Sequence, residues 1–172
     1  MLDTARLRLR LLHEDADGDA ALYARLYTDV AVMQWIAPPL AIDAANAAFG
    51  RACRHNRAAR PGHRTWRVDG RDGNALGIAA LQRDGDAAEI GVVLRETAWG
   101  RGLAREALGA VLAHAFDVMA LVLVYGERPD DGQALLVDRM FAPLGLHRVP
   151  PRRAGHARWE LPRTRWAGPH VA

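Results

Sequence analysis

The stretch from Glu89 to Tyr125 restricts the fold of this chain more than any other. Glu89–Leu94 is short, apolar and β-branched, which predicts a strand. The period then becomes helical, since one stripe at i, i+4, i+7 and i+11 is formed by Ala104, Leu108, Val111 and Ala115. Ala120–Tyr125 is an unbroken apolar run, typical of a strand covered on both faces. Strand, turn, helix and strand in this order predict two parallel strands joined by a right-handed crossover.

The turn inside this unit carries Gly100 and Gly102, where the helix opens. The first N–H groups of a helix have no partner inside it and lie at the positive end of its dipole. Glycine lets a ligand approach the backbone, so the turn fits a phosphate or pyrophosphate held by main chain. A dinucleotide fingerprint fails because position 105 is Arg105, and a P-loop fails because the chain has no lysine and no serine. A helix start softened by glycine, without any ligand, is the alternative.

Two segments of this unit, Glu89–Gly91 and Trp99–Leu108, resemble the acetyl-CoA motif of the GNAT N-acetyltransferases. The likeness is strongest to the RimJ/RimL-like branch, the ribosomal-protein N-terminal acetyltransferases and their relatives. The family pattern is Gln/Arg-x-x-Gly-x-Gly/Ala, and Gly102 and Ala104 match its last two fixed positions. Trp99 stands at the Gln/Arg position, a change common in that branch.

The resemblance implies an α+β fold, the GNAT acyl-CoA N-acyltransferase fold. It has a mixed central sheet with a splayed parallel strand pair, flanked by helices. Acetyl-CoA would be the co-substrate. Val92, Val93 and Leu94 would bind the pantetheine arm and the acetyl carbonyl through main chain, although these residues also read as plain sheet core. The pyrophosphate would be held by Gly100, Arg101, Gly102, Leu103, Ala104 and Arg105.

The implied reaction is direct attack of a primary amine on acetyl-CoA, and a carboxylate, or a water held by one, can take the amine's proton. Glu89 is the candidate base because it begins the strand beside the cofactor; an exposed charge at a strand end is the alternative. Tyr125 is the nearby hydroxyl that could act as general acid, or else a buried strand tyrosine with a hydrogen-bonded tip. Relatives often carry Asn-x-x-Ser after this strand, where this chain has Asp131 and Ala134.

The acceptor amine stays open between a protein N-terminus, a polyamine, an amino sugar and an amino acid. Trp35 is either a wall of the acceptor pocket or a plug over the core. Glu127 and Asp131 could attract a cationic acceptor, or serve only as loop and cap residues. Because no residue matches the family's general acid, a non-catalytic acyl-CoA-binding module or sensor with the same fold is the alternative function.

The remaining elements follow from periodicity and turn residues. We expect a strand at Thr4–Leu12, a helix at Asp19–Tyr27, a loop at Val32–Leu40, a helix from Asp43 to about Ala58 stopped by Pro61-Gly62, strands at Arg64–Val68, Ala75–Gln82 and Ala88–Leu94, a helix at Gln133–Ala142, and strands at Leu146–Val149 and Ala157–Leu161. The whole chain, 1–172, is expected to be a single domain, with 162–172 as a loose tail.

Composition narrows the setting. No apolar run approaches a membrane span, the N-terminus lacks a signal peptide's apolar stretch, and a lone cysteine, Cys53, fits a reducing compartment, so we expect a cytoplasmic protein. The net charge is +3 with arginines interleaved among acids, which favours a solvated surface over a nucleic-acid partner. The histidines lack metal-binding spacing, so no metal is expected. The final strands could pair between two chains and give a homodimer.

Overall fold

The computed structural model describes residues 1–59 and 62–168 of the chain. Within them, eight strands form one mixed sheet in the order β1-β2-β3-β4-β5-β6-β8-β7. Its N-terminal part is an antiparallel meander of β2 (Leu7–Leu11), β3 (His63–Gly70), β4 (Ala75–Asp84) and β5 (Ala87–Leu94). Strand β1 (Leu2–Asp3) pairs with β2 at one edge. The predicted strand at Thr4–Leu12 is therefore shorter, and its first residues form a turn.

Strand β6 (Leu123–Pro129) lies parallel to β5, and β8 (His156–Pro162) and β7 (His147–Val149) complete the sheet with antiparallel pairs. The predicted parallel pair joined by a helix is confirmed. The strand was expected at Ala120–Tyr125, but Ala120 has a φ of 54° and the strand begins only at Leu123. Leu121 is buried beside the end of the preceding helix, so the apolar run reports burial and not strand pairing alone.

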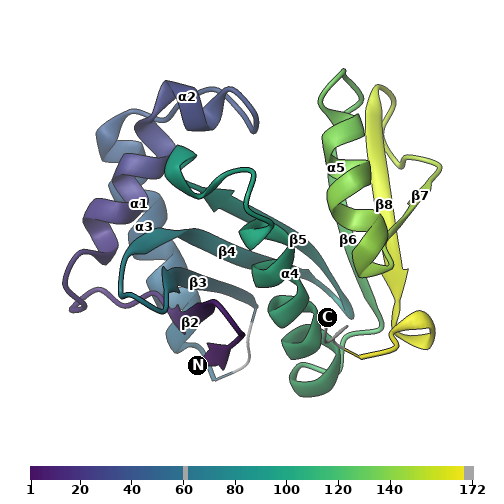
Figure 1. Cartoon of the computed structure of the whole chain (residues 1–172), viewed down its shortest axis with the longest axis horizontal. Helices are drawn as coiled ribbons and strands as arrows, with labels where there is room; N and C mark the ends of the chain where they lie inside the picture. Colours follow the sequence, from purple (N-terminus) through teal and green to yellow (C-terminus); the bar gives the residue numbers. More distant parts are fainter. Residues whose placement is uncertain (60–61, 169–172) are drawn as a thin grey trace.

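The helices cover the two faces of the sheet. Helix α4 (Leu103–Ala113), which ends in a π-helical turn η2 (His114–Val118), packs with apolar residues of β5 such as Ala88 and Ile90. The opposite face is covered by α1 (Asp19–Thr28) and α3 (Ile42–Arg57), which enclose Ile78 and Val93. Helix α5 (Ala134–Phe141) lies along β6 and β8 (Figure 1), and its Phe141 contacts Trp159 with 5.7 Å between ring centroids.

Two local expectations need correction, and the predicted end of α3 at about Ala58 agrees with the structure. Val30–Met33 forms a short helix, α2, because the Asp29 side chain accepts hydrogen bonds from the N–H groups of Ala31 and Val32. Helix α3 starts at Ile42, so Asp43 lies in its first turn and is not its cap. That helix ends at Arg57; of the stop expected after it, Pro61 lies outside the described residues and Gly62 follows the helix end.

The segment after Pro162 is less loose than expected. Pro162 is the last residue of β8, and Arg163–Arg165 form a 3-10 turn, η4. Trp166 then stacks on Phe116 with 5.3 Å between ring centroids, so the core holds the chain as far as this residue. Residues 169–172 of the predicted tail lie outside the described part.

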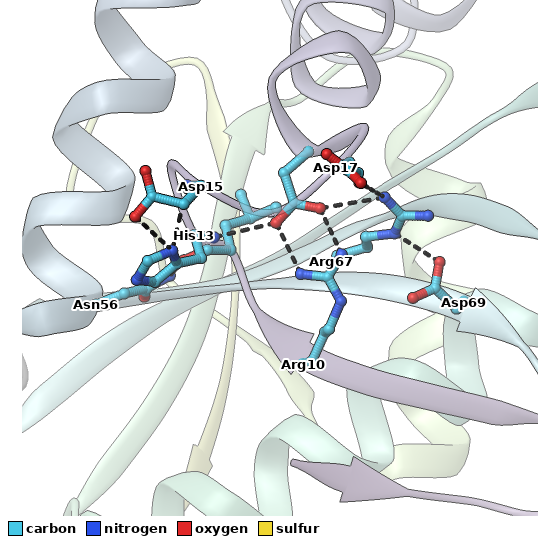
Figure 2. Close-up of polar contacts among 9 residues, drawn as sticks. Arg10, His13, Asp15, Asp17, Asn56, Arg67 and Asp69 are labelled. Carbon is cyan, nitrogen blue, oxygen red and sulfur yellow. Dashed lines mark hydrogen bonds and ion pairs between the residues drawn. The ribbon is translucent and has the colours of Figure 1, made fainter. Parts of the chain in front are cut away.

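A buried ion cluster anchors the start of α1 to the sheet. Asp19 is fully buried and accepts hydrogen bonds from Arg10 at 2.6 and 2.8 Å, from Arg67 at 3.1 Å and from the N–H of His13 at 3.0 Å. Figure 2 shows the guanidinium groups of Arg10 and Arg67 converging beneath α1, with Asp69 on the far side of Arg67. The cluster fixes α1, which forms one wall beside the candidate site.

Candidate active site

The parallel pair is joined over a very short length. Only Ala87, Ala88 and Glu89 of β5 pair with β6, opposite Leu123, Val124 and Tyr125. Beyond Glu89 the two strands diverge, as Figure 1 shows. A cleft of about 640 Å³ opens between them, lined by both strands and by α2, α4 and α5. The predicted splay of the parallel strands is confirmed, and it places the candidate site.

The alternation of β5 decides which backbone groups face the cleft. The N–H of Arg95 donates to the carbonyl of Leu76 on the β4 side, so Val93, two residues earlier, also directs its backbone toward β4, where it pairs with Ile78. Val92 and Leu94 direct their N–H and C=O groups the other way, into the splay. The Leu94 carbonyl already accepts the indole N–H of Trp99 at 2.8 Å. Val93 can therefore contribute its side chain to the cleft, but not its N–H.

The glycine turn has the predicted form. Gly100 and Gly102 have φ angles of 69° and 74°, in the left-handed region, and Leu103 is the first residue of α4. No side chain caps this helix, so its first N–H groups face outward unsatisfied by side chains. A Cβ atom on Gly100 would have nothing within 4 Å. An anion thus has an open approach to the helix start.

The other residues predicted at this turn divide by exposure. Arg101 and Arg105 are exposed, whereas Leu103 is buried in the core and can offer only its backbone. Gly100 and Ala104 line the large cleft together with Val92, Val93 and Leu94. Arg101, Gly102, Leu103 and Arg105 lie beside the cleft and do not line it.

Arg6 is a cation at this turn that the sequence reasoning missed. Its Nη1 donates to the carbonyl of Arg101 at 2.9 Å, and a Cβ on Gly102 would lie 3.6 Å from its Nη2. Glu106 holds it there, since its carboxylate accepts from Arg6 Nε at 2.6 Å, from the Arg6 N–H at 2.8 Å and from the Thr4 hydroxyl at 2.6 Å. Glu106 therefore fixes Arg6 at the turn, although the two residues lie 100 positions apart in the sequence.

Two carboxyl groups line the cleft where the strands part. Glu89 comes from β5 and Glu127 from β6. Burial raises the pKa of Glu89, and the negative charge of Glu127 raises it further, while Arg158 and the Glu127 backbone act in the opposite direction with less effect. In the part of the chain that the structure describes, Glu89 forms no ion pair. A half-buried carboxyl with a raised pKa is suited to proton transfer near neutral pH.

Tyr125 is placed differently from Glu89. It stands opposite Glu89 in the parallel register but does not line the cleft. Its ring lies under the guanidinium group of Arg158, at 3.9 Å from the ring centroid. Burial is the main cause that raises the pKa of its hydroxyl, and the nearby Glu89 adds to the rise. Tyr125 is thus a strand residue packed against a cation beside the cleft, and its role as general acid stays a prediction.

The predicted acceptor residues also separate. Trp35 lines the cleft, is 40% exposed, and makes an edge contact with Trp99 at 6.3 Å between centroids. Asp131 lies outside the main cleft, in the loop before α5: it accepts the Gln133 N–H at 2.9 Å, and it pairs with Arg128 at 3.1 Å. Glu127 and Trp35 thus line the cleft, whereas Asp131 is a loop residue beside it.

A bridge crosses the mouth of the cleft. Arg128 donates from Nη2 to the Gln133 side chain at 2.7 Å and from Nη1 to the Trp35 carbonyl at 3.3 Å. The Gln133 amide reaches the Gln34 carbonyl at 3.5 Å. The end of α2 is thereby linked to the start of α5, although these elements belong to opposite walls. No sequence pattern signalled this contact.

The family assignment rests on a sequence comparison. A sequence model of the acetyltransferase (GNAT) domain matches residues 6–149, which include both walls of the cleft and the glycine turn. The chain belongs to the GNAT acetyltransferase family. The GNAT prediction is confirmed at this level, and with it the N-acetyltransferase class, while the RimJ/RimL-like branch gains no specific support. A search of the curated proteins gave no match.

Solved structures show the same fold at low identity. The spermidine N-acetyltransferase of Vibrio cholerae, in complex with CoA and spermine, has a TM-score of 0.75 at 16% identity, covering 94% of this chain and 98% of its own. An acetyltransferase of Agrobacterium tumefaciens has a TM-score of 0.77 at 20% identity, covering 93% and 92%. A GNAT-family acetyltransferase of Bacillus anthracis has 0.74 at 16% identity, covering 95% and 98%.

Two more properties of the described residues concern metal ligands and membrane-spanning helices. Within residues 1–59 and 62–168, no group of three or more His, Cys, Asp or Glu side chains is arranged to hold a metal ion. No helix in the same ranges is long and apolar enough to cross a bilayer.

Proposed function

We propose that this GNAT domain transfers the acetyl group of acetyl-CoA directly to a primary amine. The observation that carries the proposal is one cleft in which three features meet: the free edge of β5, the open helix start at Gly100 and the Glu89 carboxyl, which has no ion-pair partner among the described residues. The family supplies acetyl transfer, and these three features supply a place for the arm, the phosphates and the proton.

The cofactor would enter from the α4 side. Its pyrophosphate would accept hydrogen bonds from the first N–H groups of α4 and would be attracted by the positive charge of Arg6. Its pantetheine arm would pair with the main chain of Val92 and Leu94 like an added strand. Val93 is left out of this pairing because its backbone is committed to β4. Gly100 and Ala104 line this approach and leave it free of large side chains.

The acceptor would come from the other face of the sheet. Glu89 would take one proton from the bound ammonium group, which frees the nitrogen lone pair to attack the thioester carbonyl carbon. An N–H facing the splay would stabilise the oxyanion. The carbon–sulfur bond then breaks and CoA leaves as a thiolate. The nitrogen loses its second proton, which reaches the thiolate through solvent, and Glu89 releases the first proton to solvent. We assign no general acid, since Tyr125 packs under Arg158 outside the cleft.

The lining favours a slender amine. The acceptor side combines apolar residues, among them Tyr27, Val32 and Trp35, with the carboxyls of Glu89 and Glu127. The bridge from Arg128 to Trp35 crosses the mouth, so a flexible chain enters more easily than a folded protein's N-terminus. A linear polyamine, the acceptor class named for the Vibrio cholerae enzyme, is therefore the first candidate, ahead of a ribosomal-protein N-terminus.

The test is a steady-state assay of CoA release with acetyl-CoA and single amines: spermidine, spermine, a peptide with a free N-terminus, glucosamine and an amino acid. Mass spectrometry identifies the acetylated product, and the Glu89→Gln variant serves as control. Turnover of spermidine or spermine above the other amines supports the proposal. Failure of every amine would overturn it.

A second candidate, a non-catalytic acyl-CoA-binding module, is favoured by one observation. Asp131 and Ala134 stand where relatives often carry Asn and Ser, and Asp131 is engaged by the Gln133 N–H and by Arg128. Saturable acetyl-CoA binding without turnover of any amine would support this alternative. The same assay therefore separates the two.

A further inference from the structure

Arg158 is buried beneath the site and has no part in the mechanism above. Only 2% of its surface is exposed. It lies on β8 opposite Glu127, and its Nη1 donates to the Glu127 carboxylate at 2.9 Å. Its Nε donates to the carboxylate of Glu160 at 2.7 Å, and its guanidinium covers the ring of Tyr125. Arg158 does not line the cleft, whereas Glu127 does.

Stability alone is a poor explanation for this arrangement. Taking an arginine and two carboxylates out of water is costly, and apolar residues often replace such a triad without loss of stability. Arg158 also keeps one buried nitrogen, Nη2, that has no hydrogen-bond partner among the described residues. A buried ionic group that is incompletely satisfied is thus a candidate for a functional role.

The strand register puts this group next to the proposed base. Glu89 stands opposite Tyr125, Tyr125 opposite Glu160, and Glu127 opposite Arg158. Side chains at these positions share one face of the sheet. Glu89 and Glu127 both line the cleft, yet among residues 1–59 and 62–168 an arginine pairs with Glu127 alone.

We propose that Arg158 is a positioning residue whose ion pair fixes the Glu127 carboxylate as the anchor for the acceptor's ammonium group, leaving Glu89 to take the proton. This proposal rests on the proposed function and deepens it. The two carboxyl groups, Glu89 and Glu127, then have different roles because their surroundings differ. The acceptor it implies carries a second positive charge, since Glu127 can hold one nitrogen while Glu89 deprotonates another.

Two neighbouring charges act on the Glu89 carboxyl in opposite directions. Glu127 disfavours its ionised form, and Arg158 favours it. Glu160 pairs with Arg158, and the Tyr125 hydroxyl remains neutral near pH 7 because its pKa is raised, with burial as the largest cause and Asp84 and Glu89 adding to it. Removal of Arg158 therefore leaves Glu127 and Glu89 as neighbouring carboxylates without a strong counter-ion, and they should share a proton.

The experiment follows the glutamate carboxyl groups directly. The chain has six glutamates, so carbon-13 labelling of this residue gives a spectrum that can be assigned by single substitutions. Arg158→Met should raise the apparent pKa of one of the two cleft carboxyls by about one pH unit or more. Glu127→Gln should lower the pKa of Glu89. Arg158→Lys should restore most of the wild-type titration, since it keeps the charge.

Kinetics supply a second readout. With spermidine, Arg158→Met should raise the amine KM about tenfold and move the acid limb of kcat/KM to higher pH, with the acetyl-CoA KM within about twofold. Glu127→Gln should raise the amine KM but move the limb to lower pH. The matched control is Arg148→Met on β7, which removes an arginine paired with Asp138 and should leave both cleft titrations unchanged.

The outcomes are distinct. Unchanged titrations and an unchanged amine KM in Arg158→Met would overturn the proposal, and so would a lowered melting temperature as the only effect. If that variant fails to fold, Arg158→Met/Glu127→Gln removes both charges, and its Glu89 pKa should lie above that of Glu127→Gln alone, because Arg158 no longer favours the ionised form. Carboxyl shifts as predicted, but with no turnover by the wild type, would support the charge assignment and overturn the proposed function.

Discussion

Glu89 and Tyr125 are the last residues that pair between β5 and β6, and Glu89 already lines the cleft that opens beyond this pair. The proposed base therefore stands at the fork of the two strands. On one side of Glu89 the two strands are paired and shield its carboxyl from water. On the other side the carboxyl faces the cleft. This position accounts for the direction of its pKa, since burial is the first cause of the rise.

The first prediction concerns this carboxyl. Glu89→Gln should lower kcat/KM about 10²- to 10⁴-fold, as expected for loss of a general base. In the wild type, activity should fall as the pH drops through the Glu89 pKa, which lies above the ordinary glutamate value of about 4.3. Rate profiles from pH 5 to 9 measure this limb. An equal loss of activity in Glu14→Gln, far from the cleft, would show that the effect is not specific.

The sign of the stability effect separates catalysis from folding. Because the folded state raises the pKa of Glu89, its ionisation opposes folding, and the stability it contributes in the neutral form is lost as the pH rises through that pKa. Glu89→Gln should therefore unfold no more easily than the wild type at pH 7. A marked drop in its urea midpoint would contradict the electrostatic account.

The second prediction tests the phosphate turn. Gly102→Asp places a carboxylate at the start of α4 and should weaken acetyl-CoA binding about 10-fold to 100-fold by calorimetry. Gly102→Asn is the matched control, because it has the same shape, tolerates positive φ comparably and carries no charge. Equal affinities for the two variants would mean that no phosphate binds here.

The third prediction assigns a role to Arg6. Arg6→Met should weaken acetyl-CoA binding about 5-fold to 20-fold, and the loss should shrink at high salt, as expected for a partly exposed charge. Arg8→Met on β2 removes an exposed arginine paired with Asp3 and should leave the affinity unchanged. Equal effects of the two substitutions would reduce Arg6 to a contribution to net charge.

The fourth prediction concerns the anchor of α1. Asp19→Asn should destabilise the fold by about 3–5 kcal/mol, because it leaves Arg10 and Arg67 without their buried partner. Burial works to raise the Asp19 pKa, but the hydrogen bonds from Arg10, His13 and Arg67 leave it lowered. Its contribution is therefore present above the ordinary aspartate pKa, about 3.9, and lost as the pH falls through the folded value. Urea unfolding at pH 7 and pH 3, with exposed Asp15→Asn as control, measures this.

Sequence periodicity recovered the parts of the fold that local patterns determine. The strand, glycine turn and helix from Glu89 to Phe116 follow from a change of hydrophobic period, and the meander follows from turn residues at Asp69–Gly73 and Arg83–Asp86. Strand β6 begins later than predicted because Ala120 has a positive φ; Leu121 is buried beside the helix end, whereas Val122 is exposed. Hydrophobicity alone cannot distinguish such a segment from a place in the sheet.

The candidate site could be predicted where backbone groups form it. It could not be predicted where it is formed by side chains that lie far apart in the sequence. Gly100, Gly102 and Val92 could be named because a glycine turn and a strand edge act through main chain. Arg6 and Arg158 could not, since their partners are Glu106 and Glu127, which lie 100 and 31 positions away. Such pairs depend on the sheet register and helix docking, which a single sequence does not display.

The measurement that tests the central claim most directly is a calorimetric titration of the wild type with acetyl-CoA, with NADH as the comparison ligand. The account predicts saturable binding at one site for acetyl-CoA and none for NADH. It also predicts that spermidine added to the saturated complex releases CoA. No binding of acetyl-CoA would contradict the account, because the splay, the glycine turn and Glu89 would then share a cleft without a cofactor.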